Sequence, residues 1–144
     1  MFITFEGIEN SGKSVQSQLL NERLKEEGIP HIYTREPGGI PSAEALRALL
    51  LNPQTKIHKY AEVFCYLAAR VELVEKVIRP ALNENKIVVC DRFVDSTFAY
   101  QGYGMNGGNV GFLNWLVDTH NLLIKIWPDL TIYIDIPVEE SLKR

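Results

Sequence analysis

Short apolar runs alternate along this chain with longer segments of helical periodicity. Four of the runs are rich in β-branched and aromatic residues and are bounded by glycine, proline or aspartate, which is typical of buried strands. They cover residues 2–5, 31–34, 86–90 and 130–136. We therefore predict four strands distributed over the whole chain.

Helices are predicted between these strands. The segments whose apolar residues recur at the spacing of one helical face cover residues 13–27, 42–51, 57–78 and 109–123. Ser42 is expected to cap the second helix, and the third is apolar enough to cross the core. The glycine-rich stretch 102–108 is predicted to be a loop.

This order of elements predicts an α/β fold. Strands joined through helices form right-handed βαβ units, which give a central parallel sheet between two helical layers, a three-layer α/β/α arrangement. Ligands of such folds bind at the carboxyl ends of the strands. With 144 residues and no internal repeat or linker, we expect a single domain over residues 1–144. The chain stops at Arg144, inside a helix predicted after the fourth strand, so we expect this domain to be incomplete there.

The composition of the chain limits the classes of partner that it is expected to bind. A formal net charge of -3 provides no broad attraction to nucleic acid or to an anionic membrane, so affinity for phosphate must come from a local cluster of donors. The sequence has no apolar run of membrane-spanning length and no signal sequence, which predicts a cytoplasmic protein. Cys65 and Cys90 lack the spacing of metal or redox pairs and are interpreted as reduced core residues.

A phosphate-loop motif follows the first predicted strand. Residues 7–14 read GIENSGKS and fit GxxxxGK[ST] without a departure. Because a strand precedes them and a helix follows, this interpretation is favoured over a glycine-rich helix start with a surface lysine. In such a loop, backbone N–H groups surround phosphate oxygens, Lys13 neutralises the transferring phosphoryl group and Ser14 offers its hydroxyl to Mg²⁺.

Asp91 follows the third predicted strand and is the candidate acidic partner of that loop. A carboxylate there holds Mg²⁺ directly or through water, although an aspartate that only caps a turn would give the same pattern. Metal ligation is therefore predicted for Ser14 and Asp91. The motif alone does not separate kinases from GTPases or regulatory ATPases. The residues predicted to bind ATP are Gly7, Ile8, Glu9, Asn10, Ser11, Gly12, Lys13, Ser14 and Val15.

Three further segments carry a resemblance to a known family. Residues 91–101 read DRFVDSTFAYQ, residues 34–39 read TREPGG, and residues 66–70 read YLAAR. From Phe2 to Arg144, with these segments in the family's order along the chain, the sequence resembles the bacterial-type thymidylate kinase family. The resemblance implies a P-loop NTPase fold with a fifth strand and a mobile lid beyond Arg144. It also implies transfer of the γ-phosphoryl group of ATP to dTMP, giving dTDP for dTTP synthesis, with Mg²⁺ and a homodimer.

The resemblance also implies the acceptor site. Tyr66 and Arg70 lie four residues apart, so one helix face presents a ring beside a cation. In the family such a ring stacks on thymine and the arginine hydrogen-bonds the base, whereas a core aromatic with an arginine reaching solvent is the ordinary alternative. The residues expected to bind dTMP are Glu9, Glu36, Pro37, Arg47, Tyr66, Arg70, Arg92, Ser96, Thr97, Tyr100 and Gln101.

Individual roles follow from the same resemblance. Arg47 and Arg92 would grip the acceptor phosphate, Glu9 would bind the sugar 3′-hydroxyl, and Tyr100 would exclude a 2′-hydroxyl. Thr97 or Gln101 would meet polar edges of the base. The residues predicted to act in catalysis are Lys13, Arg92, Asp91 and Glu9.

Two departures from the family pattern affect these expectations. Val15 replaces a residue whose hydroxyl commonly reaches the α-phosphate, which predicts weaker ATP binding. Asn10 occupies a position where one subclass carries a catalytic arginine, so that cation should come from the lid. Without it, the 144-residue chain is expected to be weakly active or inactive.

Two other functions fit parts of the pattern. One is a P-loop kinase for another nucleotide or a deoxynucleoside. The other is a nucleotide-dependent switch or binding protein without kinase activity, against which the chain has no NKxD-type guanine-reading motif.

Overall fold

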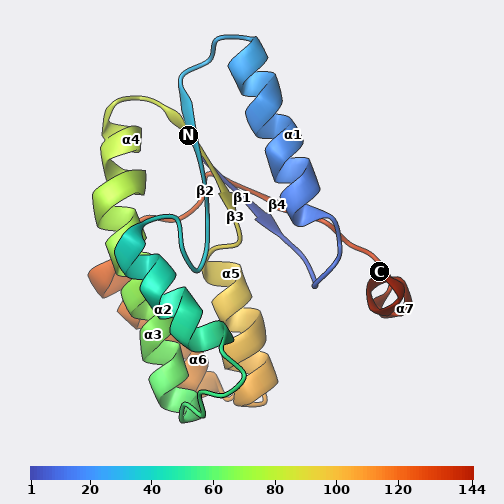
Figure 1. Cartoon of the computed structure of the whole chain (residues 1–144). Helices are drawn as coiled ribbons and strands as arrows, with labels where there is room; N and C mark the ends of the chain where they lie inside the picture. Colours follow the sequence, from blue (N-terminus) through green and yellow to red (C-terminus); the bar gives the residue numbers. More distant parts are fainter.

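The computed structural model describes all residues, Met1–Arg144, and confirms an α/β fold around one parallel sheet (Figure 1). The sheet has the order β2-β3-β1-β4. Its strands are β1 (Phe2–Glu6), β2 (His31–Arg35), β3 (Ile87–Asp91) and β4 (Leu130–Tyr133). All three pairings are parallel, so every strand ends at the same edge.

Helices connect the strands. They are α1 (Lys13–Glu26), α2 (Pro41–Leu51), α3 (Lys59–Leu73), α4 (Arg79–Asn83), α5 (Val94–Thr97), α6 (Val110–Leu123) and α7 (Val138–Lys143), with π-helical turns η1 (Val74–Ile78) and η2 (Phe98–Met105). Because η1 joins α3 to α4 and η2 extends α5, residues 59–83 and 94–105 each run as a continuous helical segment. None of these helices is long and apolar enough to cross a membrane.

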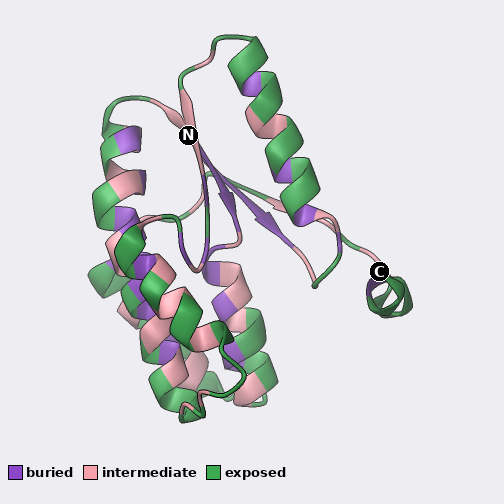
Figure 2. Cartoon of the chain, viewed as in Figure 1, coloured by how far each residue is buried: buried purple, intermediate pink, exposed green.

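Alternation along the buried strands builds a core on each face of the sheet. Phe2 of β1 and Val88 of β3 pack on one side with residues of α3, η1 and α4, whereas Ile3 and Val89 pack on the other side with Leu24 of α1. Figure 2 shows this buried strip running through β1 and β3, with the outward face of α1 exposed. The predicted three-layer arrangement is therefore confirmed.

Two local predictions were wrong. Helix α2 begins at Pro41 after an extended Ile40, and the Ser42 hydroxyl donates to Glu72 (2.6 Å) instead of capping the helix. Residues 102–105 are helical, and only residues 106–108 form a turn. A side chain at Gly102 would lie 2.6 Å from Leu113 of α6, so this glycine permits close contact between helices and does not open a loop.

Candidate functional site

The loop between β1 and α1 surrounds its own lysine. Gly7 has a φ of 148°, and a Cβ there would lie 2.5 Å from the carbonyl oxygen of Ile134. Gly12 caps α1 with a φ of 98°. The Lys13 ammonium is buried and donates to the Ile8 carbonyl (2.6 Å). Burial, followed by the nearby Arg92 guanidinium, lowers the pKa of Lys13. The loop is thus wound around a cation whose only close acceptors belong to the loop.

Ser14 and Asp91 form a small oxygen site at the start of α1. The Ser14 hydroxyl donates to one Asp91 carboxylate oxygen, and the other oxygen, Oδ1, is buried without a hydrogen-bond partner. An unpartnered buried carboxylate oxygen beside a hydroxyl fits a hard divalent cation such as Mg²⁺, which prefers oxygen ligands. No group of three or more His, Cys, Asp or Glu side chains is placed to hold a metal. Few protein ligands are usual in Mg²⁺ sites whose remaining ligands are water and phosphate oxygens.

Helix α7 holds the outside of the loop, a contact that the sequence did not predict. The Ser141 hydroxyl donates to the Glu9 carbonyl (2.7 Å), and the Asn10 amide donates to the Ser141 carbonyl (3.2 Å). Arg144 donates to the Asn10 carbonyl (3.3 Å). Asn10 has a φ of 55°, so three hydrogen bonds hold the loop tip in a left-handed conformation.

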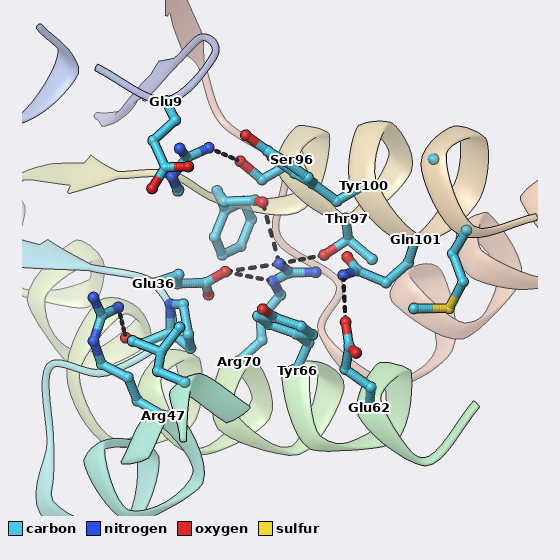
Figure 3. Close-up of a pocket in the computed structure, with 16 residues that line it drawn as sticks. Glu9, Glu36, Arg47, Glu62, Tyr66, Arg70, Ser96, Thr97, Tyr100 and Gln101 are labelled. Atoms are coloured by element: carbon cyan, nitrogen blue, oxygen red, sulfur yellow. Dashed lines mark hydrogen bonds and ion pairs between the residues drawn. The ribbon is translucent and has the colours of Figure 1, made fainter. Parts of the chain in front are cut away.

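Two cavities open at the carboxyl ends of the strands. The one against the loop has a volume of about 580 Å³ and is called here the loop cavity. Its neighbour, of about 570 Å³ and called the helix cavity, lies among α2, α3 and the helical segment 94–105 (Figure 3). They share the four charged residues Glu9, Glu36, Arg47 and Arg92. A molecule in one cavity would therefore meet a molecule in the other at two arginines.

The predicted residues gather in these cavities to different degrees. All eleven expected acceptor residues line the helix cavity. Of the nine expected ATP residues, six line the loop cavity, whereas Gly7, Ile8 and Ser11 do not. The helix cavity also has five lining residues that were not predicted: Leu51, Glu62, Phe93, Gly104 and Met105.

Arg70 lies at the floor of the helix cavity in a buried ion pair. Its Nε and Nη2 atoms contact Glu36 Oε2, both at 2.8 Å, and Nη2 also donates to the Phe93 carbonyl (3.1 Å) and to Thr97 Oγ1 (2.8 Å). Burial raises the pKa of Glu36 despite this partner. Arg70 Nη1 and Glu36 Oε1 are buried without partners. Arg70 is 3% exposed, so the alternative of an arginine reaching solvent is wrong.

Tyr66, one turn before Arg70, also lines the helix cavity. The ring is partly buried, and burial raises the pKa of its hydroxyl. Figure 3 shows Tyr66 beside Arg70 on α3, with Tyr100 on the opposite wall. The i,i+4 spacing therefore presents a ring and a cation to the same space, as the sequence predicted.

Arg92 lies between the two cavities in a constrained conformation. Its φ of 69° is unusual for a residue with a side chain. The guanidinium donates to Ser96 Oγ (3.1 Å) and weakly to the Gly7 carbonyl (3.4 Å), and it lies over the Tyr100 ring. Arg47 reaches the same junction from α2, where it donates to the Pro37 carbonyl (2.8 Å). Both guanidinium groups retain donors for an anion.

Glu6 lines neither cavity but supports the site, and the sequence analysis missed it. From the end of β1 its carboxylate accepts from the Phe93 amide (2.7 Å) and from the Ser96 hydroxyl (2.7 Å) and amide (3.3 Å). Burial raises the pKa of Glu6 despite these three donors. The signal was a carboxylate at the end of an otherwise apolar run, immediately before Gly7. Glu6 thus joins the phosphate-loop strand to the helix that orients Arg92.

Comparisons with known proteins agree on one family. A family model described as thymidylate kinase matches residues 5–144. The chain is 48% identical to a thymidylate kinase of Geotalea daltonii, covering 99% of this chain and 66% of the relative, and 45% identical to one of Psychrobacter sp., covering 99% and 69%. It therefore spans about two thirds of the length of these relatives.

A solved structure gives the same result. The crystal structure of thymidylate kinase from Ehrlichia chaffeensis superposes with a TM-score of 0.82 at 44% identity, covering 99% of this chain and 80% of that one. This similarity confirms the predicted P-loop NTPase fold.

Proposed function

Because the chain belongs to the thymidylate kinase family, we propose that the protein transfers the γ-phosphoryl group of ATP to dTMP, giving dTDP for dTTP synthesis. One observation carries the proposal: the loop cavity and the helix cavity meet at Arg47 and Arg92. Two nucleotides bound there would have their phosphates adjacent and their bases far apart. Such positioning, with charge neutralisation, is most of what phosphoryl transfer requires.

ATP is assigned to the loop cavity. Its phosphates would take hydrogen bonds from the backbone of the loop, and Lys13 would exchange its contact with the Ile8 carbonyl for a phosphate oxygen. Ser14 and Asp91 would hold Mg²⁺, which when bound offsets phosphate charge. Asn10 is engaged with Ser141 and supplies no cation, which supports a lid arginine as the remaining catalytic group.

The acceptor dTMP is assigned to the helix cavity. Arg70 Nη1 is an unpartnered donor that suits a base carbonyl, and the Tyr66 ring suits stacking. Arg47 and Arg92 would bind the monophosphate, and Glu9, which lines both cavities, would face the sugar. Tyr100 lies against Arg92 and would limit the space around the ribose.

A homodimer is proposed from an aromatic strip on α3 and α6. Phe64 is 60% exposed and lies edge-on to Trp115 (5.8 Å between ring centroids). Trp115 stacks on Phe112, which in turn lies near Tyr60. Tyr60, Phe64 and Trp115 are exposed, and such a strip of rings favours contact with another protein surface. Phe64→Glu should lower the mass measured by light scattering from dimer to monomer, and an unchanged mass would count against this assignment.

The acceptor assignment is tested by comparing dTMP with thymidine. Calorimetric titration should show that the protein prefers dTMP, and Arg92→Ala should reduce that preference roughly 10- to 100-fold because charge-assisted bonds to phosphate are lost. Arg23→Ala, at an exposed ion pair on α1, is the control. ADP release that depends on dTMP would then establish the transfer. No binding of dTMP by the unchanged protein, or an unchanged preference in Arg92→Ala, would refute the assignment.

A further inference from the structure

Gln101 carries an amide whose orientation is set by a second residue. Its side chain lies in the wall of the helix cavity and is 5% exposed. Its Nε2 donates to Glu62 Oε1 (3.2 Å), and Figure 3 shows the two joined across the cavity, from the helical segment 94–105 to α3. A carboxylate only accepts hydrogen bonds, so the amide nitrogen must face Glu62. The amide oxygen of Gln101 then has no partner within the chain and remains for a ligand.

No other contact fixes this orientation. The Gln101 backbone carbonyl accepts from the Asn106 amide (2.9 Å), which holds the main chain and leaves the side-chain amide free to turn. The two ends of an amide have nearly the same shape, so packing alone does not distinguish them. Glu62 makes no other side-chain hydrogen bond or ion pair and is therefore free to serve this one.

The result is an ordered pair of hydrogen-bonding groups beside the base position. Arg70 Nη1 is an unpartnered donor, and Thr97, which accepts from Arg70, lies one helical turn before Gln101. The wall thus presents a donor from Arg70 and an acceptor from Gln101. Thymine and uracil offer the complement, a carbonyl oxygen at position 4 and an N–H at position 3. Cytosine offers the reverse, an amino group and an unprotonated nitrogen.

We propose that Glu62 is a positioning residue that fixes the amide of Gln101 with its oxygen toward the base, and so makes the site select thymine over cytosine. The inference rests on the proposed binding of dTMP in this cavity. A buried donor facing another donor is left unpaired, which costs enough to reject the wrong base strongly. Glu62 also lines the cavity, but it would exert this selection through the orientation of the Gln101 amide.

The experiment compares dTMP, dCMP and dUMP by calorimetric titration. In Glu62→Gln the residue at position 62 can donate or accept, so the Gln101 amide is free to turn. The ratio of dTMP to dCMP affinity should fall roughly tenfold or more. The ratio of dTMP to dUMP should not change, because these bases share the same hydrogen-bonding edge. Glu22→Gln, an exposed position on α1 with the same loss of charge, should leave both ratios unchanged.

A second variant tests the direction of the effect. Glu62→Lys replaces an acceptor with a donor, so it should hold the amide oxygen and turn the nitrogen toward the base, raising the affinity for dCMP relative to dTMP. An unchanged ratio of dTMP to dCMP in both variants, with thermal unfolding showing that they are folded, would overturn the inference. That result would leave the kinase proposal intact if the unchanged protein binds dTMP, whereas absence of dTMP binding would refute the proposal itself.

Discussion

Two opposite charges are buried together at the floor of the helix cavity. Arg70 and Glu36 are 3% and 7% exposed and are joined by two contacts of 2.8 Å. Such pairs add little net stability, because desolvation offsets much of their attraction. Each nevertheless keeps one buried atom without a hydrogen-bond partner, and both residues line the cavity. The pair is therefore better explained by ligand binding than by stability.

Removing one member of this pair should be costly. Arg70→Ala leaves the Glu36 carboxylate buried and unpaired, so the free energy of unfolding in urea at neutral pH should fall by about 3 to 5 kcal/mol. The double variant Arg70→Ala, Glu36→Gln should recover part of the loss, because no charge is stranded. Arg23→Ala, at an exposed ion pair with Glu27, is the control and should have a small effect. Equal losses in Arg70→Ala and the control would contradict the buried-charge argument.

The helical segment 94–105 is held at its start by a residue from another element. Glu6 of β1 accepts from the Phe93 and Ser96 amides, as a capping residue would, although it lies 87 positions before Phe93. The same carboxylate holds the Ser96 hydroxyl that receives Arg92. Strand β1 therefore determines both the start of the phosphate loop and the position of the acceptor arginine.

Glu6→Ala should loosen that segment. With its acceptor gone, the buried Phe93 amide is unsatisfied, and the free energy of unfolding should fall by about 2 to 3 kcal/mol. Amide hydrogen exchange at Phe93 and Ser96 should accelerate more than exchange in β3. Glu22→Ala on the exposed face of α1 serves as the control. Unchanged exchange at the two amides would show that the carboxylate does not hold this helix start.

Elements whose determinants lie in their own segment of the sequence were predicted correctly, and features that depend on distant residues were missed. The four strands, α1 and α6 were predicted within a few residues because their periodicity and end signals lie in their own segments. The helical segment 94–105 was not predicted: residues 94–101 were assigned to no element and residues 102–105 to a loop, and Leu113, which Gly102 contacts, lies on another helix. Glu6 and Glu62 were missed for the same reason, because their partners are 87 and 39 positions away.

At the scale of the whole molecule, one buried histidine makes stability depend on pH. His120 of α6 lies between the rings of Phe93 and Trp127, and its Nε2 donates to the Ile126 carbonyl (2.8 Å). Burial lowers its pKa from 6.5 to about 4. Between these values the unfolded chain binds a proton that the folded protein does not. Stability from this residue is therefore complete above pH 6.5 and is lost as pH falls toward 4.

This loss should reach up to about 3 kcal/mol for the unchanged protein. Glu6 and Glu36 act in the opposite sense: burial raises both pKa values, so their contribution is lost as pH rises through the folded-state value. The test is therefore the difference in free energy of unfolding between the unchanged protein and a variant that lacks the histidine. His120→Gln keeps a donor for the Ile126 carbonyl but cannot titrate, and urea unfolding at pH 7, 5.5 and 4.5 should show the gap between the two proteins changing with pH. A constant gap would exclude the histidine as the cause.

The junction of the two cavities has a wider consequence. Its four shared side chains are two glutamates and two arginines, so their formal charges cancel, and the chain as a whole is slightly acidic. A balanced surface exerts little pull on distant anions. The junction thus distinguishes phosphate from small competing anions by the geometry of its arginine hydrogen bonds at contact. Long-range attraction does not concentrate those anions there. Arrival at the junction itself should therefore depend little on ionic strength, whereas the loop cavity beside it carries more lysine and arginine than carboxylate side chains.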